Sequence, residues 1–331
     1  MRSGRGNGEC LLADIGGTNI RFAIGAGSSL ENFQSFKVAD FETVEQAVEQ
    51  YLESTGSRTP VNACFAVACP IQGDRVQLTN NSWSFSASEL GQRLGLSSLL
   101  IVNDFKALAA AVPSLGLDQL LQIGSDFSGP DSDFPTCVVG PGTGLGTAII
   151  GPRNKGSVII DGEGGHMGFA PATDEENEIW RILKDRFGRV SYERLLSGDG
   201  LENIYLALNK IESKGVYIPR LSAADILNRA ISMETDELAE RTLKVFCAVF
   251  GSYAGDIALL SKAYGGVYLG GGILPRMFPF LQRSDFRQRF DDKGRMGKVT
   301  SQIPTFAITT KDVALRGCCR LRMEIDQDGE V

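Results

Sequence analysis

The chain has 331 residues, of which 43% are hydrophobic and 22% charged, and its formal net charge is −7. This composition is typical of globular proteins, and the length suggests about two domains. The net negative charge argues against nonspecific binding to nucleic acid and to anionic membranes, because both need clustered Lys and Arg. We expect no nucleic-acid partner and no membrane partner, and no segment reaches the ~20 apolar residues of a membrane span.

The seven cysteines form no Cys-x-x-Cys pair, and their odd number suggests reduced thiols and a cytoplasmic location. Residues 1–8 are rich in Gly and Arg, lack the apolar stretch of a signal peptide and are interpreted as a short flexible leader. The single histidine, His166, excludes a zinc site built from two histidines.

Two apolar runs, 10–13 and 21–24, flank a Gly-containing turn at 14–19 and predict a β-hairpin. The chain then alternates between helical and strand patterns, as expected for an α/β fold. Ser86 and Glu89 have the spacing of a capping box, which starts a helix. The predicted elements are a helix over 43–52, a strand over 61–68, a helix over 86–94, a strand over 99–102 and a helix over 105–112.

Residues 124–135 are predicted to form a loop, after which a strand over 136–139 enters a Gly-rich turn and returns over 147–150. Both halves therefore begin with the same strand–turn–strand pattern, a loose internal repeat that would put both turns at one cleft. The later elements are helices over 175–187, 200–211, 223–231 and 235–263, a strand over 267–269, a helix from about Pro275, a strand near Phe306 and a helix from about Asp312.

These elements predict an α/β protein of two lobes, with mixed sheets flanked by helices and a cleft between the lobes. The small lobe is expected to comprise residues 1–114 and 306–331, because the C-terminal helix returns to the first half. The large lobe is expected to comprise residues 115–305.

Three glycine-rich turns, at 14–19, 140–146 and 270–272, are candidates for binding a phosphorylated ligand. Consecutive backbone N–H groups in such turns can form an anion-binding nest. Asp14 could also hold a metal-bound water, and the third turn could support an adenine ring. Each turn also fits a purely structural interpretation: a tight hairpin, a bulged hairpin and a strand–helix junction. A P-loop, a dinucleotide-binding Gly-x-Gly-x-x-Gly and a Gly-x-Ser-x-Gly elbow are all absent from the sequence.

Several polar residues are candidates for the chemistry. Asp104 follows a strand, where ligands bind in open α/β folds, and it is also a plausible helix N-cap. Glu163 and His166, separated by two glycines, could converge on a polyol, although a lone His is often structural. Glu193 also fits a solvated helix residue, and the turn around Asn80 fits either a plain polar turn or a sugar-facing loop.

Taken together, these segments resemble the bacterial glucokinase family, within the fold group of sugar kinases, Hsp70 and actin. Their order and spacing cover nearly the whole chain, which makes the combined match much more specific than any single motif. The matching stretches are Asp14–Arg21, Leu78–Trp83, Asn103–Phe105, Gly142–Gly146, Gly162–His166, Glu193–Gly198 and Gly271–Arg276.

The resemblance implies a two-lobed actin-like ATPase (ribonuclease H-like) fold and phosphorylation of glucose at its 6-hydroxyl, with ATP as donor and Mg²⁺ carried by the nucleotide. Asp104 is the expected general base. The expected sugar contacts are Asn80, Asn103, Asp104, Glu163, His166 and Glu193. The expected nucleotide contacts are Asp14, Gly16, Gly17, Thr18, Asn19, Gly142, Thr143, Gly144, Gly271 and Gly272.

The resemblance further implies a homodimer. Related sugar kinases bind zinc through a Cys cluster after their His, but this chain has no Cys between Cys137 and Cys247, so we expect no protein-bound metal. Three alternatives remain open at this point: a kinase for another hexose, a sensor of nucleotide and sugar without turnover, and an actin-like assembly ATPase.

Overall fold

The computed structural model describes residues 9–27, 29–57, 59–71, 73–78, 83–124, 131, 133–152, 158–213, 220–232 and 236–328. The described residues separate into two compact units. Unit 1 runs to Leu115 and resumes at Thr310, and unit 2 extends from Gly116 to Thr309. The lobe boundaries expected at 114/115 and 305/306 stay a prediction.

The sheet of unit 1 has the strand order β3-β2-β1-β4-β7. Strands β1 and β2 form the hairpin predicted from the sequence, and β3 extends it antiparallel. Strands β4 and β7 continue from β1 in parallel. The bounds are Glu9–Ile15 (β1), Asn19–Ala26 (β2), Ser29–Lys37 (β3), Asn62–Val67 (β4) and Ser98–Asn103 (β7). Strand β3 was not predicted from the sequence, because it is mostly polar and has no residue more than partly buried.

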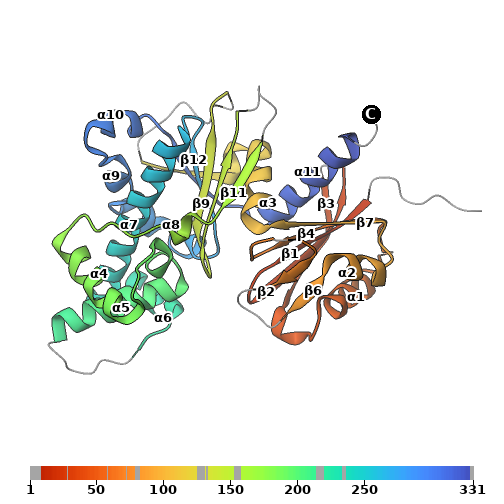
Figure 1. Cartoon of the computed structure of the whole chain (residues 1–331), viewed down its shortest axis with the longest axis horizontal. Coiled ribbons are helices and arrows are strands. Elements are labelled where there is room, and N and C mark those ends of the chain that lie inside the picture. The colour runs from red at the N-terminus through yellow and green to blue at the C-terminus, as the bar shows by residue number, and fades with distance from the viewer. Residues whose placement is uncertain are drawn as a thin grey trace, which may run out of the picture. The chain divides into compact units, whose positions relative to one another are not determined.

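Helices cover both faces of this sheet, as Figure 1 shows. Successive residues of a strand point to opposite faces. Leu11 accordingly packs with α1 (Val44–Thr55) and α2 (Ala87–Arg93), whereas Leu12 packs with α3 (Asp104–Ala111) and α11 (Val313–Asp328). Unit 1 also contains η1 (Val38–Asp40), η2 (Val112–Ser114) and the short hairpin of β5 (Arg75–Gln77) and β6 (Ser84–Ser86).

The sheet of unit 2 has the order β11-β10-β9-β12-β13-β8. Its first five strands repeat the order and directions of unit 1, with β9 and β10 as the equivalent hairpin. This finding extends the internal repeat seen in the sequence from one hairpin to a whole sheet. The bounds are Leu120–Ile123 (β8), Thr136–Pro141 (β9), Leu145–Ile150 (β10), Ile159–Gly162 (β11), Val267–Leu269 (β12) and Thr305–Ile308 (β13).

Helix α7 (Glu237–Ser261) lies at the centre of the unit 2 core, and the short helices α8 and α9 complete the packing around it. The other helices are α4 (Asp174–Phe187), α5 (Gly198–Ser213), α6 (Ala223–Ile231), α8 (Phe278–Arg283), α9 (Phe286–Asp291) and α10 (Gly297–Thr300). The 3-10 turns are η3 (Leu117–Gln119), η5 (Gly164–His166), η6 (Tyr192–Arg194), η7 (Leu274–Arg276) and η8 (Gly294–Met296).

The expectation that no segment is apolar enough to span a membrane needs a correction at α7. Within the described residues, α7 meets that criterion by length and composition, but 72% of its most apolar window is buried inside the structure. It is apolar because other elements surround it. Gly251 and Gly255 allow especially close packing, since a Cβ at either position would overlap a backbone carbonyl of α9.

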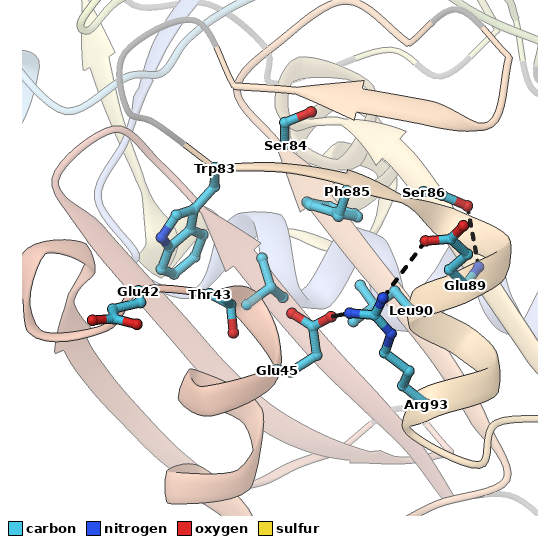
Figure 2. Close-up of a pocket in the computed structure, with 11 residues that line it drawn as sticks. Glu42, Thr43, Glu45, Trp83, Ser84, Phe85, Ser86, Glu89, Leu90 and Arg93 are labelled. Carbon is cyan, nitrogen blue, oxygen red and sulfur yellow. Dashed lines mark hydrogen bonds and ion pairs between the residues drawn. The ribbon is translucent and has the colours of Figure 1, made fainter.

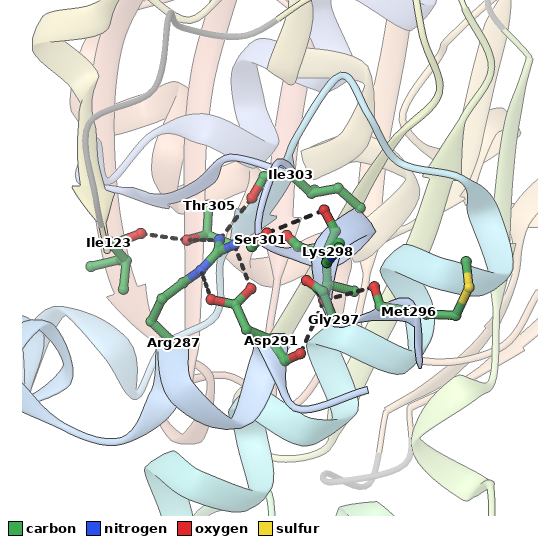
Figure 3. A network of polar contacts seen from close by, with 10 residues as sticks. Ile123, Arg287, Asp291, Met296, Gly297, Lys298, Ser301, Ile303 and Thr305 are labelled. Carbon is green, nitrogen blue, oxygen red and sulfur yellow. Dashed lines mark hydrogen bonds and ion pairs between the residues drawn. The ribbon is translucent and has the colours of Figure 1, made fainter. Parts of the chain in front are cut away.

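A polar network centred on Arg287 joins α9 to the end of the unit 2 sheet (Figure 3). The Arg287 guanidinium forms an ion pair with Asp291 at 2.7 Å and donates to the carbonyls of Thr300 and Ile303, both at 2.7 Å. Thr305 in β13 donates to the carbonyl of Ile123 in β8 at 2.6 Å. The five-donor guanidinium thus satisfies carbonyls that a simple ammonium group could not reach together.

We predict that Arg287→Met lowers the free energy of unfolding by about 3 kcal/mol, because it leaves Asp291 and two carbonyls without their donor. Urea denaturation measures the effect. Arg295→Met is the matched control, since Arg295 is exposed and should change stability by no more than about 0.5 kcal/mol. Equal effects of the two substitutions would contradict the importance of the network.

Candidate functional site

In unit 1, two of the predicted site segments follow strands that end at the same edge of the sheet. Ile15 of β1 pairs with Val67 of β4, and Val67 pairs with Asn103 of β7. Neighbouring strands lie about 4.8 Å apart, so the turn after β1 and Asp104 after β7 begin roughly 10 Å from each other. This edge therefore brings together a glycine turn and a carboxylate.

The turn after β1 is narrow and accessible. Gly16 N–H donates to the carbonyl of Asn19 at 3.0 Å, and Val38 N–H donates to the carbonyl of Thr18 at 2.9 Å. The side chains of Thr18 and Asn19 are exposed, whereas Gly16 and Gly17 are partly buried. The side chains of Thr18 and Asn19 are therefore within reach of a ligand, whereas the Gly16 N–H is already used inside the turn.

Asp14 is paired with a residue that the sequence analysis did not select. Arg21 lies directly across the hairpin from Asp14, and its Nη1 is 2.8 Å from Asp14 Oδ2. Burial raises the pKa of the Asp14 carboxyl, and the Arg21 charge acts in the opposite direction. The predicted turn at 14–19 did not reveal this pair, because Asp14 lies opposite Arg21 only when the hairpin is centred between residues 17 and 18, as it is in the structure.

The N-cap of α3 is Asn103, not Asp104 as the sequence suggested. Asn103 has an extended backbone, and its Oδ1 accepts the N–H groups of Phe105 at 2.9 Å and Lys106 at 3.4 Å. Its amide nitrogen also donates to the carbonyl of Cys69 at 3.3 Å. Asp104 is instead the first helical residue, partly buried, with Oδ1 also 2.9 Å from the Phe105 N–H.

The Asp104 carboxylate lies near the buried thiol of Cys69. Burial raises the pKa of Cys69, and the negative charge of Asp104 raises it further. Asn103 and Cys69 thus connect the ends of β7 and β4 around Asp104.

Asn80 lies outside the described residues, so its predicted contact with sugar stays a prediction. Trp83, close after it, lines a 210 Å³ pocket together with residues of α1 and α2 (Figure 2). Arg93 forms ion pairs in this pocket with Glu45 at 3.0 Å and with Glu89 at 3.7 Å. None of the predicted site residues lines this pocket.

In unit 2, the second and third glycine turns lie against one another. Gly140, near the end of β9, has no room for a side chain, because a Cβ there would overlap the carbonyl of Gly270. Gly271 has φ +97°, and a Cβ on it would overlap the carbonyl of Pro141. Backbone packing alone therefore explains the glycines at positions 140 and 271.

The glycines at positions 142 and 272 have no such explanation. A Cβ on Gly142 would come no closer than 3.9 Å to its neighbours, where it would meet Gly272 N, and a Cβ on Gly272 would meet nothing within 4 Å. Neither residue has a positive φ. Two adjoining positions thus lack side chains where the protein itself would accept them, as expected where a ligand approaches the backbone.

Glu163 and His166 converge at η5. Glu163 Oε2 is 3.8 Å from His166 Nε2, and both side chains are about 60% exposed. The two glycines between them fit η5 onto β10, since a Cβ on Gly165 would be 2.5 Å from the carbonyl of Leu145. The backbone of η5 is therefore packed down while its two polar side chains point outward.

Glu193 is not a solvated helix residue. It lies in η6, is partly buried, and its Oε2 accepts the N–H of Leu145 at 2.9 Å. Since Gly165 packs on the carbonyl of the same Leu145, the start of β10 joins Glu163, His166 and Glu193 to the glycine turn. Below them, Thr147 and Tyr253 share a hydrogen bond, and Tyr192 donates to Asp256 at 3.2 Å.

Two sheets of the same topology, each opening with a glycine-turn hairpin, together with exposed polar side chains beside the second turn, define the actin-like ATPase fold in its sugar-kinase form. A family model described as glucokinase matches residues 11–324. The chain therefore belongs to the glucokinase family, whose reaction is the ATP-dependent phosphorylation of glucose. The predicted fold, family and reaction are confirmed.

The relatives agree over nearly the whole length. The glucokinase of Chromobacterium violaceum is 43% identical over 308 residues, which are 93% of this chain and 87% of that protein. The crystal structure of a glucokinase from an Antarctic psychrotroph is 37% identical, with a TM-score of 0.81 over 96% of this chain and 99% of that one. A ROK family glucokinase from Streptomyces griseus, solved with glucose and AMPPNP, shares the fold at 18% identity, with a TM-score of 0.66 over 95% of this chain and 99% of that one.

We predict that Asn103→Ala lowers the free energy of unfolding by about 1 kcal/mol, because α3 loses its cap. Asn103→Ser retains an oxygen that can accept the N–H groups of Phe105 and Lys106. It should lower the free energy of unfolding by only a few tenths of that amount. Thermal denaturation of both variants measures the difference, and equal losses would show that capping is not the role of Asn103.

We predict that Gly142→Ala and Gly272→Ala leave the melting temperature nearly unchanged but raise the KM for ATP by about tenfold, the effect of roughly 1.4 kcal/mol of lost binding. Gly140→Ala is the control, since its methyl group would overlap Gly270 and should destabilise the fold by about 1–3 kcal/mol. An unchanged KM for ATP in both variants would exclude a ligand at these glycines.

Proposed function

We propose that the protein transfers the γ-phosphoryl group of ATP to the 6-hydroxyl of glucose, with Asp104 as the general base. The reaction class comes from the family. The observation that supports Asp104 is its place at the first position of α3, partly exposed, on the same sheet edge as the Gly16–Asn19 turn.

The environment of Asp104 suits a base. Asp104 lies in the first turn of α3, where the partial positive charge of the helix N-terminus attracts an anionic side chain. Asp104 would take the proton of the 6-hydroxyl as that oxygen attacks the γ-phosphorus in line. Such assistance is typically worth about 10²–10⁴-fold in rate.

The other sugar contacts are proposed to come from Asn80, Asn103, Glu163, His166 and Glu193. The support is the exposure of Glu163 and His166 and their 3.8 Å separation, which suits bridging to neighbouring hydroxyls. The Asn103 amide nitrogen has two N–H donors, of which Cys69 takes one. Fixing several hydroxyls orients the attacking one, and it discriminates against sugars that lack them.

The nucleotide phosphates are proposed to bind the turns Gly16–Asn19 and Gly142–Gly144, with adenosine at Gly271 and Gly272. The open space at Gly142 and Gly272 supports this. Among the nucleotide candidates, Gly144 has a second explanation, because the Glu193 carboxylate fills the space of its missing side chain.

Mg²⁺ is proposed to arrive with ATP, and it would supply neutralisation of charge on the phosphate oxygens. Asp14 fits an outer contact through water, because Arg21 binds only one of its two oxygens. The described part of the chain has no group of three or more His, Cys, Asp or Glu residues that could hold a metal. Mg²⁺ usually keeps several waters and binds through substrate phosphates.

A homodimer in the cytoplasm completes the proposal. The family resemblance supports the dimer, and sedimentation of the purified protein tests it. All seven cysteines are buried thiols that take part in no disulfide, which supports a reducing compartment.

We predict that Asp104→Asn lowers kcat by about 10²–10⁴-fold, because the amide cannot accept the proton. A coupled assay of ADP release with saturating glucose measures it. Asp174→Asn is the matched control: Asp174 is likewise the first residue of its helix, after the cap Thr173, and is exposed. A near-normal kcat for Asp104→Asn would overturn the assignment.

A further inference from the structure

The glycine turn between β9 and β10 is held by one short segment of the chain, residues 193–198. At the β10 side, Glu193 Oε2 accepts the Leu145 N–H at 2.9 Å. At the β9 side, the Gly198 N–H donates to the carbonyl of Gly142 at 3.0 Å. The turn Gly142–Gly144 lies between these two points of attachment.

The fit of the carboxylate against the turn explains one of its glycines. A Cβ on Gly144 would lie 2.6 Å from Glu193 Oε2, well inside van der Waals contact. The φ of Gly144 is not positive, so conformation does not demand glycine there. The space that a side chain at position 144 would need is the space that the Glu193 carboxylate occupies.

Residues 193–198 are themselves firmly held. The Ser197 hydroxyl donates to the Glu193 carbonyl at 2.9 Å and accepts the Gly200 N–H at 3.0 Å, which fixes the start of α5. Tyr192 is buried, with its ring centroid 4.9 Å from that of Tyr253. Because the backbone on both sides of Glu193 is anchored, its carboxylate can hold the turn in one position.

The same segment is connected to the proposed sugar contacts. The Tyr192 N–H donates to the carbonyl of Met167 at 3.0 Å, and Gly168 and Ser191 form an isolated β-bridge. Met167 directly follows His166. Glu193 therefore lies between the sugar-facing turn η5 and the glycine turn, with backbone hydrogen bonds on one side and its carboxylate on the other.

We infer that Glu193 is a positioning residue for the phosphate turn: through the Leu145 N–H, it sets the turn in the conformation that receives the triphosphate. This inference rests on the proposed function, in which the turn binds ATP, and it adds a role to the sugar contact proposed for Glu193. The inference concerns the turn alone and does not depend on Asp104.

The charge of Glu193 and its support of the turn have opposite effects on nucleotide affinity, so the direction of the change distinguishes them. A carboxylate repels a triphosphate, so removal of its charge alone would strengthen nucleotide binding. Removal of a turn support weakens it. The two effects separate in Glu193→Gln, which loses the charge but keeps an oxygen that can accept the Leu145 N–H.

The experiment is titration calorimetry of AMPPNP with Mg²⁺, in the absence of sugar. We expect Glu193→Ala to weaken binding by about 10- to 100-fold, the loss expected for one charge-assisted hydrogen bond. Glu193→Gln should bind within a few-fold of the unsubstituted protein. Glu163→Ala is the comparison variant, since it should raise the KM for glucose without weakening the analogue. Unchanged or tighter binding by Glu193→Ala would overturn the inference.

A double-substitution cycle tests the contact itself. Gly144→Ala should displace the carboxylate and weaken the analogue about as much as Glu193→Ala does. In the Glu193→Ala background, the methyl group has the vacated space, so Gly144→Ala should add little. Additive losses would show that position 144 and Glu193 act independently, contrary to the inference.

The results also separate this inference from the proposed function. If Glu193→Ala raises only the KM for glucose and leaves analogue binding intact, Glu193 is a sugar contact alone and the inference is wrong, whereas the proposed reaction stands. If Asp104→Asn keeps its turnover, the proposed base is wrong, but the calorimetry still decides the role of Glu193, since no phosphoryl group is transferred in it.

Discussion

Backbone lies directly against backbone where β9 and β12 end, and the arrangement of unit 2 around its glycine turn depends on that contact. Gly140 and Gly271 make it possible, because a Cβ at either position would overlap a carbonyl oxygen of the other segment. Gly165 allows the same kind of close backbone contact between η5 and β10, where η5 packs on the carbonyl of Leu145. Close backbone contact leaves no freedom to slide, so the polar groups carried by these segments hold fixed positions.

Unit 1 reaches a comparable result with side-chain hydrogen bonds. Asn103 caps α3 and ties β7 to the segment after β4, and Arg21 ties Asp14 across the hairpin. The parallel register of β1, β4 and β7 then places both groups at one edge of the sheet. The two units share a topology, but the candidate site segments are held by close backbone packing in unit 2 and by side-chain hydrogen bonds in unit 1.

The glycines of the second and third turns and of η5 fall into two classes that look the same in the sequence. Gly140, Gly165 and Gly271 are required by neighbouring backbone, and Gly144 by a carboxylate. Gly142 and Gly272 face open space. Only the second class indicates a ligand. A glycine-rich motif therefore points to a binding site only at those glycines that no contact within the protein requires.

Local patterns in the sequence determined most of the elements, because hydrophobic period, caps and turn residues act over a few positions. The hairpins, α1, α2, α6 and β12 were all predicted within two or three residues, and Thr43 and Ser86 serve as caps. The order of the seven motifs also sufficed to identify the family. The elements that were not predicted are β3, which has little apolar patterning, the three- and four-residue strands β5, β6, β8 and β11, and the short helices α9 and α10.

Tertiary structure alone decided which polar residues meet. Glu193 looked like a solvated helix residue because its partner, the Leu145 N–H, is 48 positions away. Asn103, and not Asp104, caps α3 because the carbonyl of Cys69 holds its amide, a contact across 34 positions. Such long-range hydrogen bonds leave no periodic trace in the sequence, since they arise only when strands that are distant in the chain are paired in one sheet.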